Sequence, residues 1–171
     1  MTHREANELA AQLWRLRELL ETLLFKYDEQ LLLLGAGRAR WASRGAREIE
    51  IVAEQLHDCR LATSVTMGGA GAAWQLPEAA TLRALAMGAP GVWREILTDH
   101  FEALLGLIAE VETMDAEWGA RAGAGGYGGG ADPRAAARDG SASADGAQMP
   151  TVNAVARPGV YSAQVAELIG I

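Results

Sequence analysis

The sequence predicts an all-α protein, in which a long antiparallel helical hairpin, a short helix and a further long helix form an elongated bundle. Three observations support this fold class. Apolar residues recur at spacings of three and four over long stretches, which is the period of a helix with one buried face. Glycine and proline cluster at the points that separate these stretches. No stretch alternates apolar and polar residues for long enough to predict a sheet.

The first helix is expected over residues 4–34, which contain neither proline nor glycine. Its apolar residues follow the seam of a helix that packs lengthwise on another, with one gap at Gln30. Gly35 and Gly37 come next, and glycine readily takes the left-handed conformation that ends a helix. The short turn that they predict makes the next helix an antiparallel neighbour. The seam residues are Leu9, Leu13, Leu16, Leu20, Leu23, Tyr27 and Leu34.

The second helix is expected over residues 38–66, and the glycine-rich segment "TMGGAGAAW" that follows is expected to form a loop. A short helix then stops at Gly88. Pro90 opens the last long helix, because the first helical residue needs no N–H donor, and this helix is expected to end near Trp118. The second helix has the stripe Trp41, Ile49, Val52, Leu56 and Cys59, and the last long helix has the stripe Trp93, Leu97, Phe101, Leu104, Ile108 and Val111.

The composition changes after the last long helix, so we divide the chain into a helical domain, residues 1–118, and a tail, residues 119–171. The tail holds 11 of the 20 glycines. Its middle has too little apolar surface to offset the chain entropy of folding, which predicts disorder. Its last dozen residues differ, because a short amphipathic helix over 160–169 would place Tyr161, Val165, Leu168 and Ile169 on one face.

Charge and cysteine content restrict the partners and the compartment. The formal net charge is -7, which argues against nucleic acid or an anionic membrane as a main partner. Residues 90–118 hold one arginine against seven acids. The single cysteine, Cys59, allows no intrachain disulfide, the start "MTHREANELA" has no apolar signal core, and no apolar run is long enough to span a membrane. We expect a cytoplasmic protein without stable membrane insertion.

No motif predicts catalysis, a metal or a cofactor. Glu54 and His57 have the Glu-x-x-His spacing of di-metal bundles, but the second such pair is missing, which favours a solvated polar face. The segment "GAGGYG", residues 123–128, matches a dinucleotide fingerprint in letters but has no strand before it and no helix after it. Cys59 lies on an apolar stripe and has no basic partner in view. We therefore expect a protein that is not an enzyme.

An arginine patch is the serious alternative site. Arg40, Arg44 and Arg47 share one helical face next to Trp41, which is typical of a nucleic-acid interface. The same arginines could pair with acids of neighbouring helices or form a solvated face. The acidic total of the chain counts against nucleic acid.

The segment "LWRLRELLETLLFKYDEQLLLLGAGRARWASRGAREIE" resembles the FlgN-like flagellar export chaperones in their actinobacterial form. Later, "LRALAMGAPGVWREILTDHFEALLGLIAEV" looks like the family's Leu-x-x-Leu-Ala, Pro and Trp elements. The resemblance covers about residues 8–118. Its first block consists of Trp14 to Leu20, Leu23 to Lys26, Leu31 to Leu34 and Gly37 to Trp41.

This resemblance implies a cytoplasmic chaperone of the flagellar type III export system, without a cofactor. Such chaperones hold the C-terminal segments of hook–filament junction proteins and deliver these clients to the export gate. We place client binding on the stripe from Trp93 to Val111. A tyrosine near the end of the last helix helps the family to dock on the gate, and Tyr127 lies nearest to that place. The alternative is a self-associating helical bundle without a secretion client, and the sequence leaves open whether the chain forms a homodimer.

Overall fold

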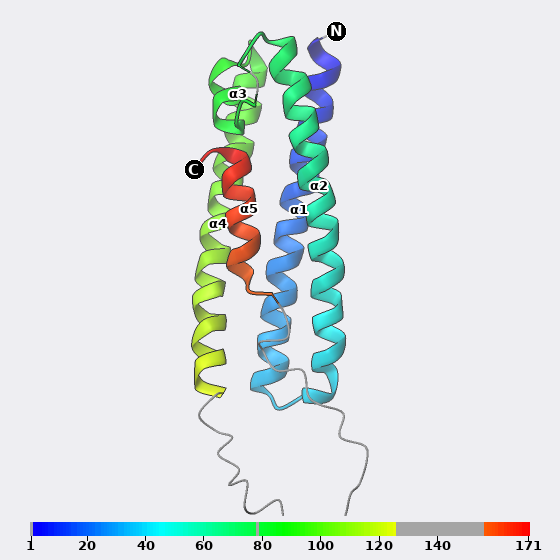
Figure 1. Ribbon diagram of the computed structural model, residues 1–171, viewed down its shortest axis with the longest axis vertical. Helices are drawn as coiled ribbons and strands as arrows, with labels where there is room; N and C mark the ends of the chain where they lie inside the picture. Colours follow the sequence, from blue (N-terminus) through cyan, green and yellow to red (C-terminus); the bar gives the residue numbers. More distant parts are fainter. Residues whose placement is uncertain (1, 78, 126–155) are drawn as a thin grey trace, which may run out of the picture.

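The computed structural model describes residues 2–77, 79–125 and 156–171. Within these ranges the chain forms α-helices and one 3₁₀ turn, with no strand, so the predicted all-α class is confirmed. Figure 1 shows the long helices side by side along the long axis, with α3 near one end and α5 next to α4. In chain order the elements are α1 (Thr2–Gly35), η1 (Ala39–Trp41), α2 (Ala42–Ala73), α3 (Leu82–Gly88), α4 (Val92–Gly125) and α5 (Pro158–Ile169).

The predicted hairpin of α1 and α2 is confirmed, and a Schellman motif ends α1. Gly37 has a φ of +67°, in the left-handed region. Its N–H donates to the Leu34 carbonyl at 3.1 Å, and the N–H of Arg38 donates to the Leu33 carbonyl at 2.9 Å. These bonds satisfy carbonyls that a helix end leaves without partners. The chain can therefore turn back sharply into α2.

The apolar seam of α1 forms the centre of the core. Every predicted seam residue is buried except Leu34, which is half-buried. Gln30, the gap in the seam, is buried too, and its Nε2 donates to the Ala42 carbonyl at 3.0 Å. Gly45 makes room for this amide, since a Cβ at that position would overlap Gln30 Oε1. The polar residue in the seam thus joins the hairpin's two helices near the turn.

The prediction of a loop in the glycine-rich segment is wrong, because α2 continues to Ala73 without a break. Met67, Ala70 and Gly71 are buried in this last part of α2. A Cβ at Gly71 would lie 3.5 Å from Leu85 of α3, so the helix end packs closely there. A glycine inside a helix costs about 1 kcal/mol relative to alanine. Burial against neighbouring elements offsets that cost, which local composition does not reveal.

α3 stops at Gly88, as predicted, and leads the chain into α4. Thr81 begins it, with its Oγ1 accepting the N–H of Ala84 at 3.3 Å, as an N-cap residue does. At the other end, a Cβ on Gly88 would clash with the Leu76 side chain. Gly91, with a φ of +57°, completes the turn. α3 packs mainly against α4 and so closes one end of the bundle.

α4 runs beyond its expected end at Trp118 to Gly125, so the boundary expected at residue 119 falls inside a helix. Trp118 is buried. In the next turn, Arg121 Nη1 donates to the Leu31 carbonyl of α1 at 3.0 Å. These contacts hold the helix through a stretch that is rich in glycine and alanine.

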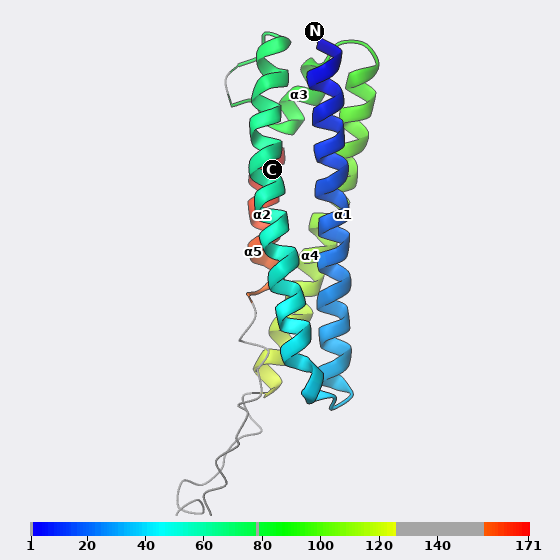
Figure 2. The same ribbon diagram turned by 90° about the vertical axis from the view of Figure 1, so that its right-hand side faces the viewer.

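The helix expected over residues 160–169 is present as α5, docked on the bundle. It contacts α4 most, and also α2 and α3. In Figures 1 and 2 it runs along the bundle with its C-terminal end toward α3. Residues 126–155, which were expected to be disordered, lie outside the described residues.

Candidate binding grooves along helix α4

The six residues predicted to bind a client face the inside of the bundle. Five are buried, and Phe101 is half-buried. In this structure they belong to the core and do not form an open surface. We call them the α4 stripe: Trp93, Leu97, Phe101, Leu104, Ile108 and Val111.

The C-terminal helix α5 lies on the side of α4 that carries this stripe. The helical spacing of the stripe, continued by one turn beyond Val111, reaches Asp115. Asp115 in turn binds the start of α5 directly. The sequence did indicate that α5 has an apolar face. It did not indicate that this face docks on α4, the helix that carries the stripe predicted for a client.

Asp115 holds the N-terminal end of α5 through the backbone and a side chain. Its Oδ1 accepts the N–H of Gly159 at 3.0 Å, where a carboxylate favours the positive end of the helix dipole. Arg157 donates from Nη2 to Oδ2 at 2.6 Å and from Nε to Oδ1 at 3.1 Å. Because the arginine is largely exposed, the ion pair contributes only about 0–1 kcal/mol. The buried face of α5 must therefore supply most of the docking energy.

Tyr27 of α1 makes a second contact with the start of this segment. Its hydroxyl donates to the carbonyl of Ala156. Its ring meets Trp118 of α4 edge-on, with the ring centroids 5.0 Å apart. Burial raises the pKa of Tyr27 well above its usual value, and the nearby Tyr161 raises it further. The hydroxyl therefore stays neutral and able to donate at physiological pH.

The apolar face and the C-terminal end of α5 complete the docking. Val165 and Ile169 are fully buried, which is worth about 1.5–3 kcal/mol for each side chain. Gly170 ends the helix with a φ of +88°. A Cβ at Gly170 would lie 2.6 Å from Thr81 Oγ1, so α5 ends in close contact with the residue that caps α3.

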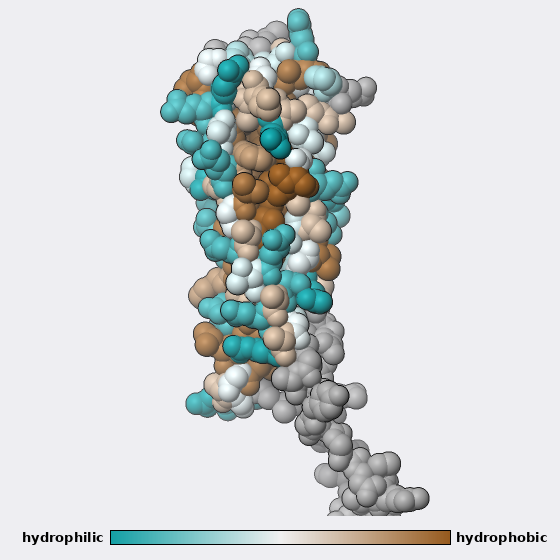
Figure 3. Space-filling model, turned by 90° about the vertical axis from the view of Figure 1, so that its left-hand side faces the viewer, coloured by the Kyte–Doolittle hydropathy of each residue, from teal (hydrophilic) through white to brown (hydrophobic). Residues whose placement is uncertain are grey.

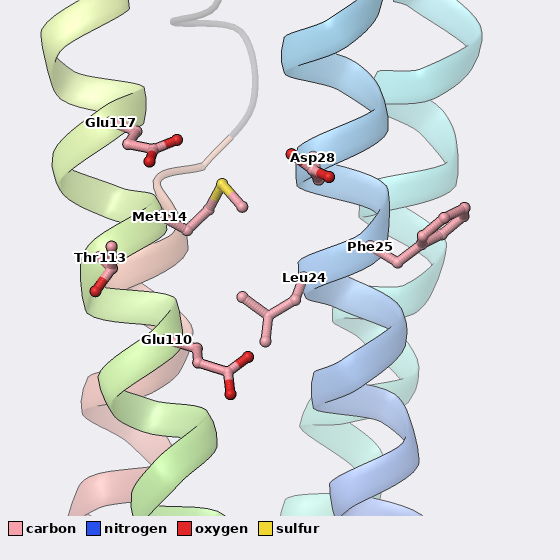
Figure 4. Close-up of a pocket in the computed structure, with 7 residues that line it drawn as sticks. All are labelled: Leu24, Phe25, Asp28, Glu110, Thr113, Met114 and Glu117. Carbon is pink, nitrogen blue, oxygen red and sulfur yellow. The ribbon is translucent and has the colours of Figure 1, made fainter.

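Apart from the surface on which α5 docks, which we call the α5 site, a groove that we call the α1–α4 groove separates α1 from α4. In the described part of the chain α4 packs less extensively on α1 than α2 does. One hollow of about 360 Å³ opens between these helices. In Figure 4, Met114 of α4 and Leu24 of α1 point toward each other across it. The hollow is lined by Leu24, Phe25, Asp28, Glu110, Thr113, Met114 and Glu117.

Closer to the start of α1, the same groove widens into a hollow of about 760 Å³. Trp14 lines it, is 54% exposed, and meets the His100 ring edge-on at a centroid distance of 5.3 Å. The Arg17 guanidinium lies 4.3 Å from the centroid of the Trp14 ring. Burial lowers the pKa of His100, and Arg17 lowers it further, while Asp99 opposes the shift. His100 is thus a neutral imidazole at physiological pH.

The side of the molecule formed by α4 also exposes apolar surface. Figure 3 shows hydrophobic side chains gathered on this side, with hydrophilic ones around them. Leu105 of α4 is 41% exposed, and Phe101 is half-buried. Sequence reasoning did not single out Leu105, Trp14 or Phe25, because each lies between the seam positions of its helix. Their position could have been predicted, because a large apolar residue that lies between the seam positions of a helix is expected on its exposed side.

The arginine patch is exposed and partly paired with acid. Arg44 Nε lies 3.2 Å from Glu48 Oε1, and Lys26 binds the same carboxylate at 2.7 Å. Trp41, which was expected on the buried stripe of its helix, is 44% exposed instead, and Arg40 lies 5.0 Å from its ring centroid. Trp41 lies in η1, before the regular helix begins, so it does not share the face of that stripe.

The remaining sequence candidates lie apart from the α5 site and from the α1–α4 groove. Glu54 and His57 are exposed on α2, and no group of three or more metal-binding side chains occurs among the described residues. Cys59 is buried, and burial raises the pKa of its thiol, as in a core residue. Tyr127, the residue predicted to dock on an export gate, lies outside the described residues.

The chain matches no family model, no curated protein and no solved structure. A search of its described helices finds none with the length and apolar character to cross a membrane. The fold assigns the chain to the class of helical bundles, with hollows between α1 and α4.

Proposed function

We propose that this protein is a cytoplasmic export chaperone of the flagellar type III secretion system. It binds an amphipathic C-terminal segment of a hook–filament junction protein, keeps that client unassembled and delivers it to the export gate. The resemblance over residues 8–118 supports the flagellar assignment. The docking of α5 on the bundle supports the mode of binding.

The observation that carries the proposal is the docking of α5 on α4, next to the end of the stripe that is predicted to bind the client. Its 12 residues form an amphipathic helix with buried Val165 and Ile169. Helices bind grooves of this kind through apolar residues three or four positions apart. A client helix with the same spacing would replace α5 and bury the same apolar floor.

Displacement of α5 is energetically feasible. A helix of this length is marginal in water on its own, so α5 depends on its docked contacts. A polypeptide of 30 residues, 126–155, separates the last residue of α4 from Ala156. α5 can therefore leave the groove without any break in the fold of α1, α2 and α4.

The proposal is tested by calorimetric titration of the full chain with the C-terminal fragment of a hook–filament junction protein. Asp115→Ala weakens the hold on α5, so the client should bind several-fold more tightly. Phe101→Ala, added to that variant, removes apolar floor and should weaken binding again. Glu112→Ala, one turn away and exposed, is the control. The absence of binding by the wild type and by Asp115→Ala would refute the proposal.

Self-association is the second candidate function, and the structure of α5 favours it in one respect. A helix that fits its own groove also fits the groove of a second copy, so two chains could exchange α5. Light scattering coupled to size exclusion measures the mass over a range of concentrations. A dimer that Val165→Asp converts to a monomer would support exchange. A monomer at all concentrations would exclude it.

A further inference from the structure

The α1–α4 groove consists of two hollows away from the docked helix α5, and Trp93 is the one residue of the α4 stripe that lines them. Its two hollows follow one another along the same pair of helices. On α1 the wide hollow is centred near Trp14, and the smaller hollow is centred near Phe25. At about 1.5 Å per residue, this separation is roughly 16 Å, or about three helical turns. A helix lying lengthwise in the groove could therefore place an apolar side chain in each hollow.

Apolar groups line the groove at both ends. Trp14 is 54% exposed and Phe25 is 63% exposed, although both are large aromatic residues. Met114 and Leu24 form the floor of the smaller hollow (Figure 4). Ile96 lines the larger one. Exposed apolar surface of this kind, bordered by polar residues, is typical of a protein interaction site.

The border of the groove is strongly acidic. Five carboxylates line the two hollows, against one arginine, Arg17. Among the residues that the structure describes, none of the five forms an ion pair. A partner that carries lysine or arginine would supply the missing positive charge. The five are Asp28, Asp99, Glu102, Glu110 and Glu117.

His100, which lines the wide hollow, has a buried ring nitrogen without a partner. His100 is only 3% exposed, and its Nδ1 makes no hydrogen bond with any described residue. An unsatisfied buried polar atom costs about 1–3 kcal/mol.

We propose that the α1–α4 groove docks a basic amphipathic helix of a partner protein. The helix buries apolar side chains in the two hollows and places lysine or arginine against the acidic border. The acidic border disfavours nucleic acid and anionic lipid. It also disfavours a second copy of this chain, which carries a net charge of -7. α5 is already docked on another side of α4 and is not basic, so it is not the occupant.

Two synthetic helical peptides test the proposal with the full-length chain. One has leucine on one face and lysine on the other over about five turns, and its counterpart has glutamate in place of every lysine. Fluorescence anisotropy of the labelled peptides gives the dissociation constants at low and high salt. The lysine peptide should bind at least about tenfold more tightly than the glutamate peptide, and salt should weaken it.

Matched variants locate the binding site. Glu110→Lys with Glu117→Lys should weaken the lysine peptide at least about tenfold, and Met114→Ala should weaken it several-fold. Glu54→Lys with Asp58→Lys changes the net charge equally on the exposed face of α2 and should have less than about a twofold effect. Circular dichroism checks that each variant is folded.

Three results would overturn the proposal. They are equal binding of the two peptides, equal weakening by the two pairs of charge reversals, or no binding of the lysine peptide at low salt. Asp115→Ala distinguishes the two sites: it should leave the binding of the lysine peptide unchanged if the peptide lies in the α1–α4 groove, and should tighten it if the peptide replaces α5. Failure here is therefore separate from failure of the chaperone proposal.

Discussion

The carboxylate of Asp115 accepts the backbone N–H of Gly159 at 3.0 Å, across 44 residues of sequence. A side chain of one long helix thereby caps the N-terminus of the short helix that covers it. α5 has no capping side chain of its own, because Arg157 occupies its N-cap position. The start of α5 therefore depends on α4 for a contact that most helices supply locally.

Replacement of Asp115 by alanine should loosen α5 and leave the long helices intact. The loss of the cap and of the bond to Arg157 costs about 1–2 kcal/mol. Backbone amides of residues 160–169 should then exchange with deuterium about tenfold faster, as measured by mass spectrometry. Glu112→Ala should leave this exchange unchanged. Unaltered protection of α5 in Asp115→Ala would show that the cap does not hold it.

Replacement of Gly170 by alanine should disrupt the other end of α5. The residue has a φ of +88°, and its new Cβ would lie 2.6 Å from Thr81 Oγ1, so backbone strain and steric overlap add together. We expect a loss of more than about 2 kcal/mol in the docking of α5, read from the same amide exchange. Gly37→Ala is the matched control. It has a similar φ of +67° with open space around it, and should cost about 1–2 kcal/mol in overall stability without exposing α5.

Two glycines of α2 should respond to alanine in opposite directions. Gly69 has nothing near its missing Cβ, so Gly69→Ala should raise the free energy of unfolding by up to about 1 kcal/mol. At Gly45, the Gln30 amide fills the space that a Cβ would occupy. Gly45→Ala should therefore lower the free energy of unfolding by about 1–3 kcal/mol and break the hydrogen bond from Gln30 to the Ala42 carbonyl. Urea denaturation measures both changes. Stabilisation by both substitutions would contradict the packing of Gln30 against Gly45.

Tyr27→Phe should remove the hydrogen bond to Ala156 at a cost of about 1 kcal/mol near neutral pH. The folded-state pKa of Tyr27 is raised above its ordinary value of 10.0. Above about pH 10 the unfolded state therefore loses a proton that the folded state keeps, and wild-type stability falls as pH rises. The variant lacks this loss. Denaturation at about pH 8 and about pH 11 should show the difference between wild type and variant shrinking. A constant difference would contradict burial of the hydroxyl.

His100 should make the bundle sensitive to mild acid. Its folded-state pKa lies below the ordinary value of 6.5. As pH falls below 6.5, the unfolded state takes up a proton before the folded state does, so stability decreases until the folded pKa is reached. His100→Gln should reduce this decrease between about pH 7.5 and about pH 5, as measured by urea denaturation. His57→Gln removes an exposed imidazole and serves as the control. An unchanged pH dependence of stability in His100→Gln would show that His100 does not cause the acid sensitivity.

Much of the fold follows from local sequence patterns. The seam from Leu9 to Tyr27 predicted a helix that packs lengthwise, and each of its residues is buried. Gly37 predicted the turn of the hairpin, because few other residues adopt its left-handed backbone. The spacing from Tyr161 to Ile169 predicted a short amphipathic helix, and α5 is that helix.

The candidate site was predictable only in part. The stripe from Trp93 to Val111 is apolar in the sequence, but an apolar face does not specify whether the chain's own helix or a partner covers it. The exposed Trp14 and Phe25 also gave no clear pattern. Their role depends on the distance between α1 and α4, which no local pattern encodes.

The sequence by itself determined that this protein is a helical bundle, where its hairpin turns, and which faces of its helices are apolar, because helical periodicity and glycine conformation act over a few residues. Tertiary structure alone decided that α2 continues through its glycines, that α5 seals one side of α4, and that the groove toward α1 stays open with unpaired acids along it. Those outcomes depend on burial and charge between segments distant in sequence, where packing energies exceed the roughly 1 kcal/mol preferences of single residues.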